Sequence, residues 1–148
     1  MSVGYRIGEV AERASVTPRT LRYYEELGLL EPAGHSPGGA RRYSDADVDR
    51  VLRIRDLQEL MGFDLHAIHR IVTAEARLQR LREEYRAGVD VARRREMIRE
   101  AIEINDELRT EVREKLGRIR DVLQDLNAKA ARYRRLLQSP PGATGRLR

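Results

Sequence analysis

Apolar residues recur at helical spacing in four segments at the front of the chain. The spacing predicts a helix over residues 6–14, a second over 18–27, a third between Ser44 and Gly62, and a fourth that begins after Asp64. The positions expected to face inward are Ile7, Val10, Ala11, Ala14, Leu21, Tyr24, Leu27, Val48, Val51, Ile54, Leu57, Met61, Leu65, Ile68, Ile71 and Val72. These stripes predict a small helical core.

The first two helices are separated by a very short connection. Ser15-Val16 forms the turn, Thr17 is placed as N-cap with Pro18 at the first helical position, and Gly28 ends the second helix. Two short helices joined in this way are typical of a helix-turn-helix.

A segment rich in turn residues follows the second helix. Residues 29–32 and 40–43 are short arms around a Pro-Gly-Gly tip, which predicts a small β-hairpin, or wing. Strand alternation would place Arg41 and Tyr43 on one side of the second arm and Arg42 on the other.

The rear of the chain has a different pattern. Leu78, Leu81 and Tyr85 predict a short fifth helix that is broken near Gly88. From residue 90 to about 137 there is no proline, and apolar positions alternate steps of four and three, which is typical of a coiled coil. The seam consists of Val112, Leu116, Ile119, Leu123, Leu126, Ala130, Tyr133 and Leu137. So narrow a stripe on so long a helix needs a partner helix.

Four residues upstream extend this interpretation. The same alternation of steps holds for Met97, Ala101, Ile104 and Leu108. The step from Leu108 to Val112 is also four residues, so two steps of four follow one another. Such a stutter would locally relax the supercoil. The last ten residues contain Pro140-Pro141-Gly142 and are expected to form a flexible tail.

Composition narrows the function classes. The 148 residues include no cysteine, which excludes disulfides, thiolate metal sites and thiol redox switches. The net charge of +5 comes from the rear: residues 1–73 hold 10 basic and 11 acidic residues, and residues 74–148 hold 19 and 13. No signal segment or membrane span is evident, so a cytoplasmic, nucleoid-associated protein is expected.

The outward face of the second helix carries the candidate chemistry. A helical wheel places Arg19, Arg22, Tyr23 and Glu26 opposite the apolar face. Guanidiniums and a phenol on the second helix of a helix-turn-helix suit contacts to phosphates and to the major groove. An ordinary solvated face is the alternative, because arginine is abundant throughout this chain.

Several motifs in order resemble one known family. They are Ile7-Gly8-Glu9-Val10-Ala11, Thr20-Leu21-Arg22-Tyr23-Tyr24-Glu25, Gly28-Leu29-Leu30, Arg41-Arg42-Tyr43-Ser44 and Gly62-Phe63. Over residues 5–72 the chain closely resembles the MerR (mercury-resistance regulator) family. The resemblance implies an all-α fold with a small β-hairpin wing: a winged helix-turn-helix DNA-binding domain at 1–73, a helical connector at 74–89, an antiparallel coiled-coil dimerisation helix at 90–138 and a tail at 139–148.

The resemblance also assigns roles to residues. It places Arg22, Tyr23, Tyr24, Arg41, Tyr43 and Arg55 at or near the DNA backbone. The full candidate DNA-binding set is Thr17, Arg19, Thr20, Arg22, Tyr23, Tyr24, Arg41, Arg42, Tyr43 and Arg55. The dimerisation set is Val112, Leu116, Ile119, Leu123, Leu126, Tyr133 and Leu137.

Some features depart from the family pattern. Ser15 stands where glycine is usual in the turn, which predicts mild backbone strain. The cysteines of the metal-sensing branches are missing, and no cofactor is expected. His66 and His69 lie three apart, a spacing that metal sites use, but surface or packing roles are favoured. No phosphate-binding glycine loop and no nucleophile with a base at motif spacing is evident, so the protein is not predicted to be an enzyme.

The sequence therefore predicts a homodimeric regulator that binds a pseudo-palindromic promoter site and distorts its spacer. The expected partners are double-stranded promoter DNA, a second copy of the chain, RNA polymerase indirectly, and an organic effector or a protein partner that the sequence does not identify. An architectural DNA-bending protein without an inducer and a coiled-coil protein adaptor are the alternatives. They differ in DNA preference: the first binds many sites, and the second binds none.

Overall fold

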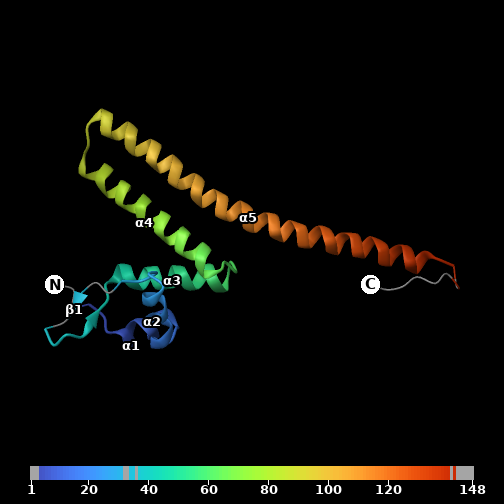
Figure 1. Ribbon diagram of the computed structural model, residues 1–148, viewed down its shortest axis with the longest axis horizontal. Helices are drawn as coiled ribbons and strands as arrows, with labels where there is room; N and C mark the ends of the chain where they lie inside the picture. Colours follow the sequence, from blue (N-terminus) through green and yellow to red (C-terminus); the bar gives the residue numbers. More distant parts are fainter. Residues whose placement is uncertain (1–3, 32–33, 36, 141, 143–148) are drawn as a thin grey trace. The chain divides into compact units, whose positions relative to one another are not determined.

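A computed structural model describes residues 4–31, 34–35, 37–140 and 142. The elements in chain order are α1 (Ile7–Ala14), α2 (Pro18–Glu26), β1 (Gly34–His35), β2 (Arg41–Arg42), α3 (Asp45–Glu59), α4 (Leu65–Ala87) and α5 (Val91–Gln138) (Figure 1). The chain divides into two compact units, residues 1–108 and 109–148, which are described separately below. The fold is mostly helical, as predicted.

The helix starts follow the predicted capping chemistry. The Thr17 hydroxyl accepts a hydrogen bond from the Thr20 N–H at 3.1 Å, which begins α2. Ser44 and Asp47 cap α3 reciprocally, with donor–acceptor distances of 3.2 and 2.8 Å. The Asp64 carboxylate accepts from the Ala67 N–H at 2.8 Å and begins α4. The predicted caps at these three helices are confirmed.

The main apolar core of the first unit lies in its front half. It gathers side chains from α1, α2, α3 and the first half of α4, together with connecting residues that pack between them. Its buried members are Val10, Ala11, Ala14, Leu21, Tyr24, Leu29, Leu30, Tyr43, Val48, Val51, Ile54, Leu57, Phe63, Ala67, Ile68, Ile71 and Val72. Most of the positions expected to face inward are therefore buried.

Four of those positions are not fully buried: Ile7 and Leu65 are partly buried and pack against the core, and the other two are exposed. Leu27 and Met61 are exposed, with exposed fractions of 39% and 51%. The reason is geometric, because α2 ends at Glu26 and α3 ends at Glu59. Beyond the last helical turn, the 3.6-residue period no longer decides which way a side chain points.

The segment after α2 contains a short antiparallel strand pair. In its register, Gly34 is paired with Arg42 and His35 with Arg41. The predicted first arm was residues 29–32, but pairing begins only at Gly34, because Leu29 and Leu30 are instead buried in the core. Residues 32, 33 and 36 of the predicted hairpin lie outside the described part of the chain.

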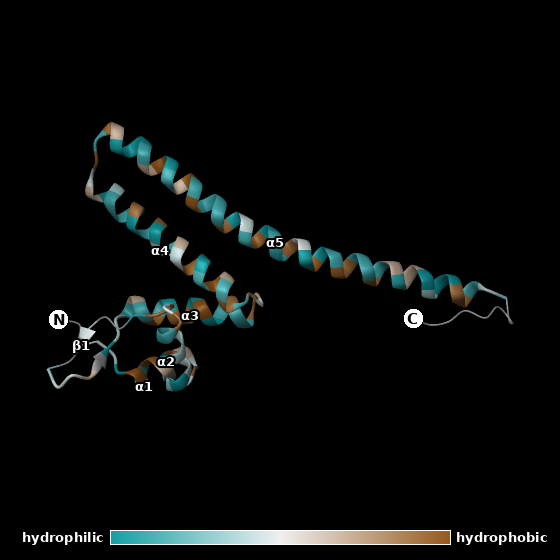
Figure 2. Ribbon diagram, viewed as in Figure 1, coloured by the Kyte–Doolittle hydropathy of each residue, from teal (hydrophilic) through white to brown (hydrophobic). Residues whose placement is uncertain are grey.

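α4 corrects one prediction. The fourth helix and the expected short fifth helix are a single element, Leu65–Ala87, which ends at Gly88. Its first half belongs to the main core, and its second half packs against the start of α5 through a second core (Figures 1 and 2). The buried members of the second core are Ala74, Leu81, Met97 and Ile104.

This second core also corrects the interpretation of the run that starts at Met97. Met97 and Ile104 are buried against α4 of the same chain, and Ala101 and Leu108 pack beside them. These four residues are therefore not an upstream continuation of the coiled-coil seam. The seam residues from Val112 onward are exposed, so the cover that α4 gives to the first run does not extend to them.

The second unit consists mainly of the rest of α5. Every large apolar side chain of its predicted seam is exposed, from 43% at Leu116 and Tyr133 to 87% at Leu137. Of the predicted tail, residues 141 and 143–148 lie outside the described residues. Among the helices that are described, none combines the length and apolar character that crossing a membrane requires.

Candidate nucleic-acid interface

α2 has two chemically distinct faces. Leu21 and Tyr24 point into the main core with exposed fractions of 0% and 3%. Arg19, Arg22 and Tyr23 lie on the exposed side, where Tyr23 is 48% exposed. Neither arginine forms an ion pair with another described residue. The core therefore fixes α2 so that two guanidiniums and a phenol face outward, as the helical wheel predicts.

A side chain of α3 contacts the turn between α1 and α2. Ser15 has φ 54° and ψ 42°, a left-handed conformation that residues with a Cβ adopt at a cost. Arg55 on α3 donates a hydrogen bond from Nη1 to the carbonyl oxygen of Ala14 at 2.7 Å. This contact satisfies a carbonyl at the end of α1. Arg55, predicted to lie near DNA, thus supports the turn.

The two threonines of the candidate set lie at the N-terminus of α2. Their hydroxyl oxygens are 2.9 Å apart, and that of Thr17 is also the cap of the helix. Both hydroxyls are thus engaged in fixing the start of α2. In this arrangement the threonines set the position from which Arg19 and Arg22 project.

Tyr24 and Tyr43 are core residues in the structure. Burial raises the pKa of the Tyr24 phenol, whose hydroxyl donates to the side-chain oxygen of Gln58 at 3.3 Å. Tyr43 is fully buried, and its hydroxyl donates to the Glu25 carboxylate. Because Glu25 lies on α2, this bond ties the end of the strand pair to that helix.

The strand pair is also joined to the N-terminal segment. The backbones of Tyr5 and Tyr43 exchange hydrogen bonds of 2.7 and 2.9 Å. Arg42 is half-buried and donates from Nη1 to the carbonyl oxygen of Gly4 at 3.4 Å. The side chain of Arg41 lies outside the described part of the structure, so its role at DNA stays a prediction.

The two histidines on α4 do not gather further metal ligands. His66 and His69 are both exposed. Among the described residues, no group of three or more histidine, aspartate or glutamate side chains is placed to hold a metal ion. The arrangement offers no support for a metal site at these positions.

The pattern of the sequence missed two residues that position the site. No local pattern marks Glu25 as the acceptor of the Tyr43 hydroxyl, which lies 18 positions away. Arg50 on α3 donates from Nε to the carbonyl oxygen of Leu29 at 2.5 Å and fixes the chain after α2. Both contacts join segments that are distant in sequence, and only the fold brings them together.

Comparison with known proteins agrees with this architecture. The family model for MerR HTH family regulatory proteins matches residues 5–75. The chain is 36% identical over 121 residues to the HTH-type transcriptional regulator PA4778 of Pseudomonas aeruginosa, covering 81% of this chain and 80% of that protein. It is 28% identical over 134 residues to the HTH-type transcriptional regulator YfmP of Bacillus subtilis, covering 90% and 96%.

A solved structure shows the same fold. HiNmlR, described as a MerR family regulator lacking the sensor domain and bound to promoter DNA, superposes with a TM-score of 0.50 at 22% identity, covering 90% of this chain and 92% of that one. With the family model and the relative in Pseudomonas aeruginosa, this establishes the class as helix-turn-helix transcriptional regulators. The chain belongs to the MerR family.

Proposed function

We propose that the protein is a homodimeric regulator of transcription that binds a pseudo-palindromic promoter site through α2 and the adjoining strand pair. The observation that carries this proposal is the two-faced α2, with Leu21 and Tyr24 locked in the core and Arg19, Arg22 and Tyr23 exposed. The promoter DNA bound by HiNmlR supports the same role for this chain.

The helix-turn-helix geometry suits entry of α2 into a major groove. Arg22 and Tyr23 would contact the DNA backbone and fix the register, while Arg19 and the N-terminal turn reach toward base edges. The β1–β2 pair would act as the wing, with Arg41 reaching a phosphate beside the groove. Tyr43 and Arg55 serve in this proposal by positioning α2 rather than by touching DNA, because both contact protein groups.

A second copy of the chain would cover the exposed seam of α5. The seam residues Val112, Leu116, Ile119, Leu123, Leu126, Tyr133 and Leu137 repeat with the steps of a coiled coil. Antiparallel pairing of two such helices gives a two-fold axis, which requires an inverted repeat in the DNA. The half-site centres are then separated by whole helical turns, about 34–36 Å each.

The dimer would regulate by deforming the promoter between its two half-sites. Such a deformation costs a few kcal/mol, about 1–6 in elastic estimates, and contacts from both DNA-binding units must offset it. Shortening the promoter spacer by two base pairs tests this mechanism. Transcription should then no longer need the protein, whereas continued dependence would favour direct recruitment of RNA polymerase or simple occlusion.

Selection of duplexes from a random pool, followed by footprinting, tests the function itself. The expected product is an inverted repeat bound by two chains. On that duplex, Arg22→Ala should weaken binding and lower the slope of log affinity against log salt by about one unit, because one phosphate contact is lost. Arg95→Ala removes the same charge from an exposed position on α5 and should leave the slope unchanged.

The same experiment separates the alternatives. An architectural DNA-bending protein would enrich many duplexes without a shared repeat. A coiled-coil adaptor would enrich none and would show no salt-dependent affinity for DNA. Either outcome would overturn the proposed function.

A further inference from the structure

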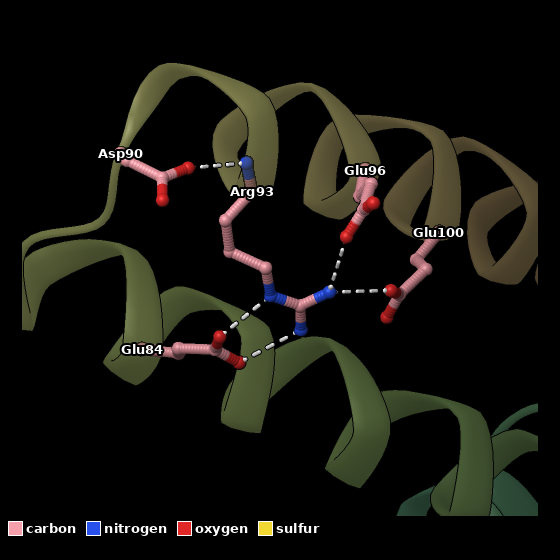
Figure 3. A network of polar contacts seen from close by, with 5 residues as sticks. All are labelled: Glu84, Asp90, Arg93, Glu96 and Glu100. Atoms are coloured by element: carbon pink, nitrogen blue, oxygen red, sulfur yellow. Dashed lines mark hydrogen bonds and ion pairs between the residues drawn. The ribbon is translucent and has the colours of Figure 1, made fainter.

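The second core of the first unit has two edges of opposite character. Along one edge, Arg77 on α4 pairs with Glu107 on α5 at 3.2 Å. Further along the same edge, Arg93 forms a two-pronged bond with Glu84 on α4, at 2.7 and 3.1 Å, and reaches Glu100 at 3.0 Å (Figure 3). Both arginines in these contacts pair with carboxylates of the same chain, so this edge has no unpaired guanidinium among Arg77 and Arg93.

The other edge is an open apolar groove of about 350 Å³. Its floor is formed by the buried side chains of Leu81 and Met97, and its rim by Tyr85 and Ile98, which are 46% and 50% exposed. This volume falls within the range of sites that bind small organic molecules, about 300–1,000 Å³.

Two guanidiniums line this groove without an ionic partner. Arg82 and Arg86 are exposed, lie one helical turn apart on α4, and form no ion pair with any described residue. The α5 residues across the groove include Ala101 and Asn105, neither of which carries a charge. No glutamate or aspartate among the described residues lines this groove, in contrast to the edge of Arg77 and Arg93. The positive charge of Arg82 and Arg86 is therefore complementary to an anion that is not part of the chain.

We propose that this groove binds an amphipathic organic anion, with an aromatic or aliphatic body on Leu81 and Met97 and a carboxylate, sulfonate or similar group between Arg82 and Arg86. The anion would gain charge-assisted hydrogen bonds, which are about twice as strong as neutral ones. A role for this molecule as the effector rests on the proposed function, but the binding site itself does not.

A second copy of the chain fits the groove less well. The end of α5 that a coiled-coil partner could offer carries Lys129, Arg132, Arg134 and Arg135, and no acidic residue from 126 to 138. Its positive charge would be brought against Arg82 and Arg86. Charge complementarity therefore favours a small anion as the occupant.

The groove also has a structural route to the DNA-binding unit. α4 is one helix from Leu65 to Ala87, with Ile68 and Ile71 in the main core and Leu81 in the second. A molecule bound between α4 and α5 would stabilise the packing of α5 on α4, the helix that also packs against α3. Binding is expected to change DNA affinity through this single continuous helix.

Two fluorescent probes of matched shape test the site on the full-length protein without DNA. Anilinonaphthalene sulfonate is the anion, and phenylnaphthylamine is its uncharged analogue. The wild type is expected to bind the sulfonate about tenfold more tightly than the amine, which corresponds to one charge-assisted contact. Arg82→Gln combined with Arg86→Gln should abolish that preference and leave amine binding unchanged. Ala101→Phe, which fills the groove, should weaken both.

The matched control removes two charges elsewhere. Arg95→Gln combined with Arg99→Gln lies on exposed positions of α5 outside the groove and should keep the preference. An equal loss in the control pair, or no loss in the groove pair, would overturn the proposal. Binding of the probes only after dimer dissociation by Leu123→Glu would also overturn it, since a second copy would then cover the groove. Because no DNA is present, these results are independent of whether the protein regulates transcription.

Discussion

One helix, α5, behaves differently in its two parts. In residues 91–108 an apolar face meets α4 of the same chain, and Met97 and Ile104 are 3% and 2% exposed. In residues 109–138 no side chain is buried, although the apolar residues are as regularly spaced. The periodicity of a helix shows that one face is apolar. Which element or chain packs against that face depends on the rest of the fold.

The comparison gives the two parts different sources of stability. The first part contributes to a core that one chain completes, and polar contacts such as Arg93 with Glu84 reinforce it (Figure 3). A long helix of exposed apolar and charged residues gains little from propensity alone and is stabilised by packing. The second part is therefore expected to depend on a second chain.

Substituting Leu123 by glutamate should have the largest effect. An unpaired carboxylate buried in the seam costs about 3 kcal/mol or more, so the dimer should weaken by at least a hundredfold. Sedimentation over a range of concentrations measures this change. Ala128→Glu adds the same charge on the face opposite the seam and should leave the dimer intact. Equal effects of the two would mean that the seam is not the interface.

Ile104→Ala should have the next largest effect, on the first part of α5. Removing a buried isoleucine leaves a cavity and should lower the free energy of unfolding by about 2–4 kcal/mol. Ile102→Ala is the matched control: it lies two residues away, is 57% exposed, and should change stability by less than about 0.5 kcal/mol. Urea unfolding curves recorded at one fixed protein concentration measure both changes. A comparable loss at Ile102 would show that this face is covered as well.

Tyr43→Phe tests the tie between the strand pair and α2. Loss of the hydrogen bond to Glu25 should lower the free energy of unfolding by about 1–2 kcal/mol, because a partly buried carboxylate loses this donor. Tyr23→Phe is the matched control: it removes a phenol hydroxyl from an exposed position on α2 and should not change the free energy of unfolding. If Tyr43 instead touched DNA, Tyr43→Phe would weaken DNA binding at temperatures where the protein is fully folded, and it would leave the free energy of unfolding unchanged.

Gly117→Ala is expected to have the smallest effect, a gain. Gly117 lies in the second part of α5, and a Cβ built there meets no atom of the same chain within 4 Å. Alanine should stabilise the helix by about 1 kcal/mol, since glycine in a helix interior has a larger conformational entropy to lose. Thermal unfolding followed by circular dichroism measures the gain. A loss instead would place a partner backbone against this position.

Local chemistry made much of the fold predictable. The Thr17, Ser44 and Asp64 caps are read from residue type, and the period of α2 separates Leu21 and Tyr24 from Arg22 and Tyr23. These features depend on neighbours within one helical turn. The family resemblance then placed the helix-turn-helix in its functional class.

The failures share another cause. The buried run at Met97 and Ile104 has the spacing of a coiled-coil seam, and only the position of α4 shows that it is covered within the chain. The Tyr43 hydroxyl and the Arg82–Arg86 groove likewise depend on residues far away in sequence. Periodicity and alternation describe one element at a time and do not identify its partner.

The mass of the wild-type protein in solution tests the central claim most directly. If the exposed seam of residues 112–137 is completed by a second copy, light scattering at micromolar concentration should give twice the 17.1 kDa chain mass. Ala128→Glu should keep that mass, and Leu123→Glu should reduce it to the single-chain value. A stable wild-type protein of 17.1 kDa, with α5 still helical, would contradict the account.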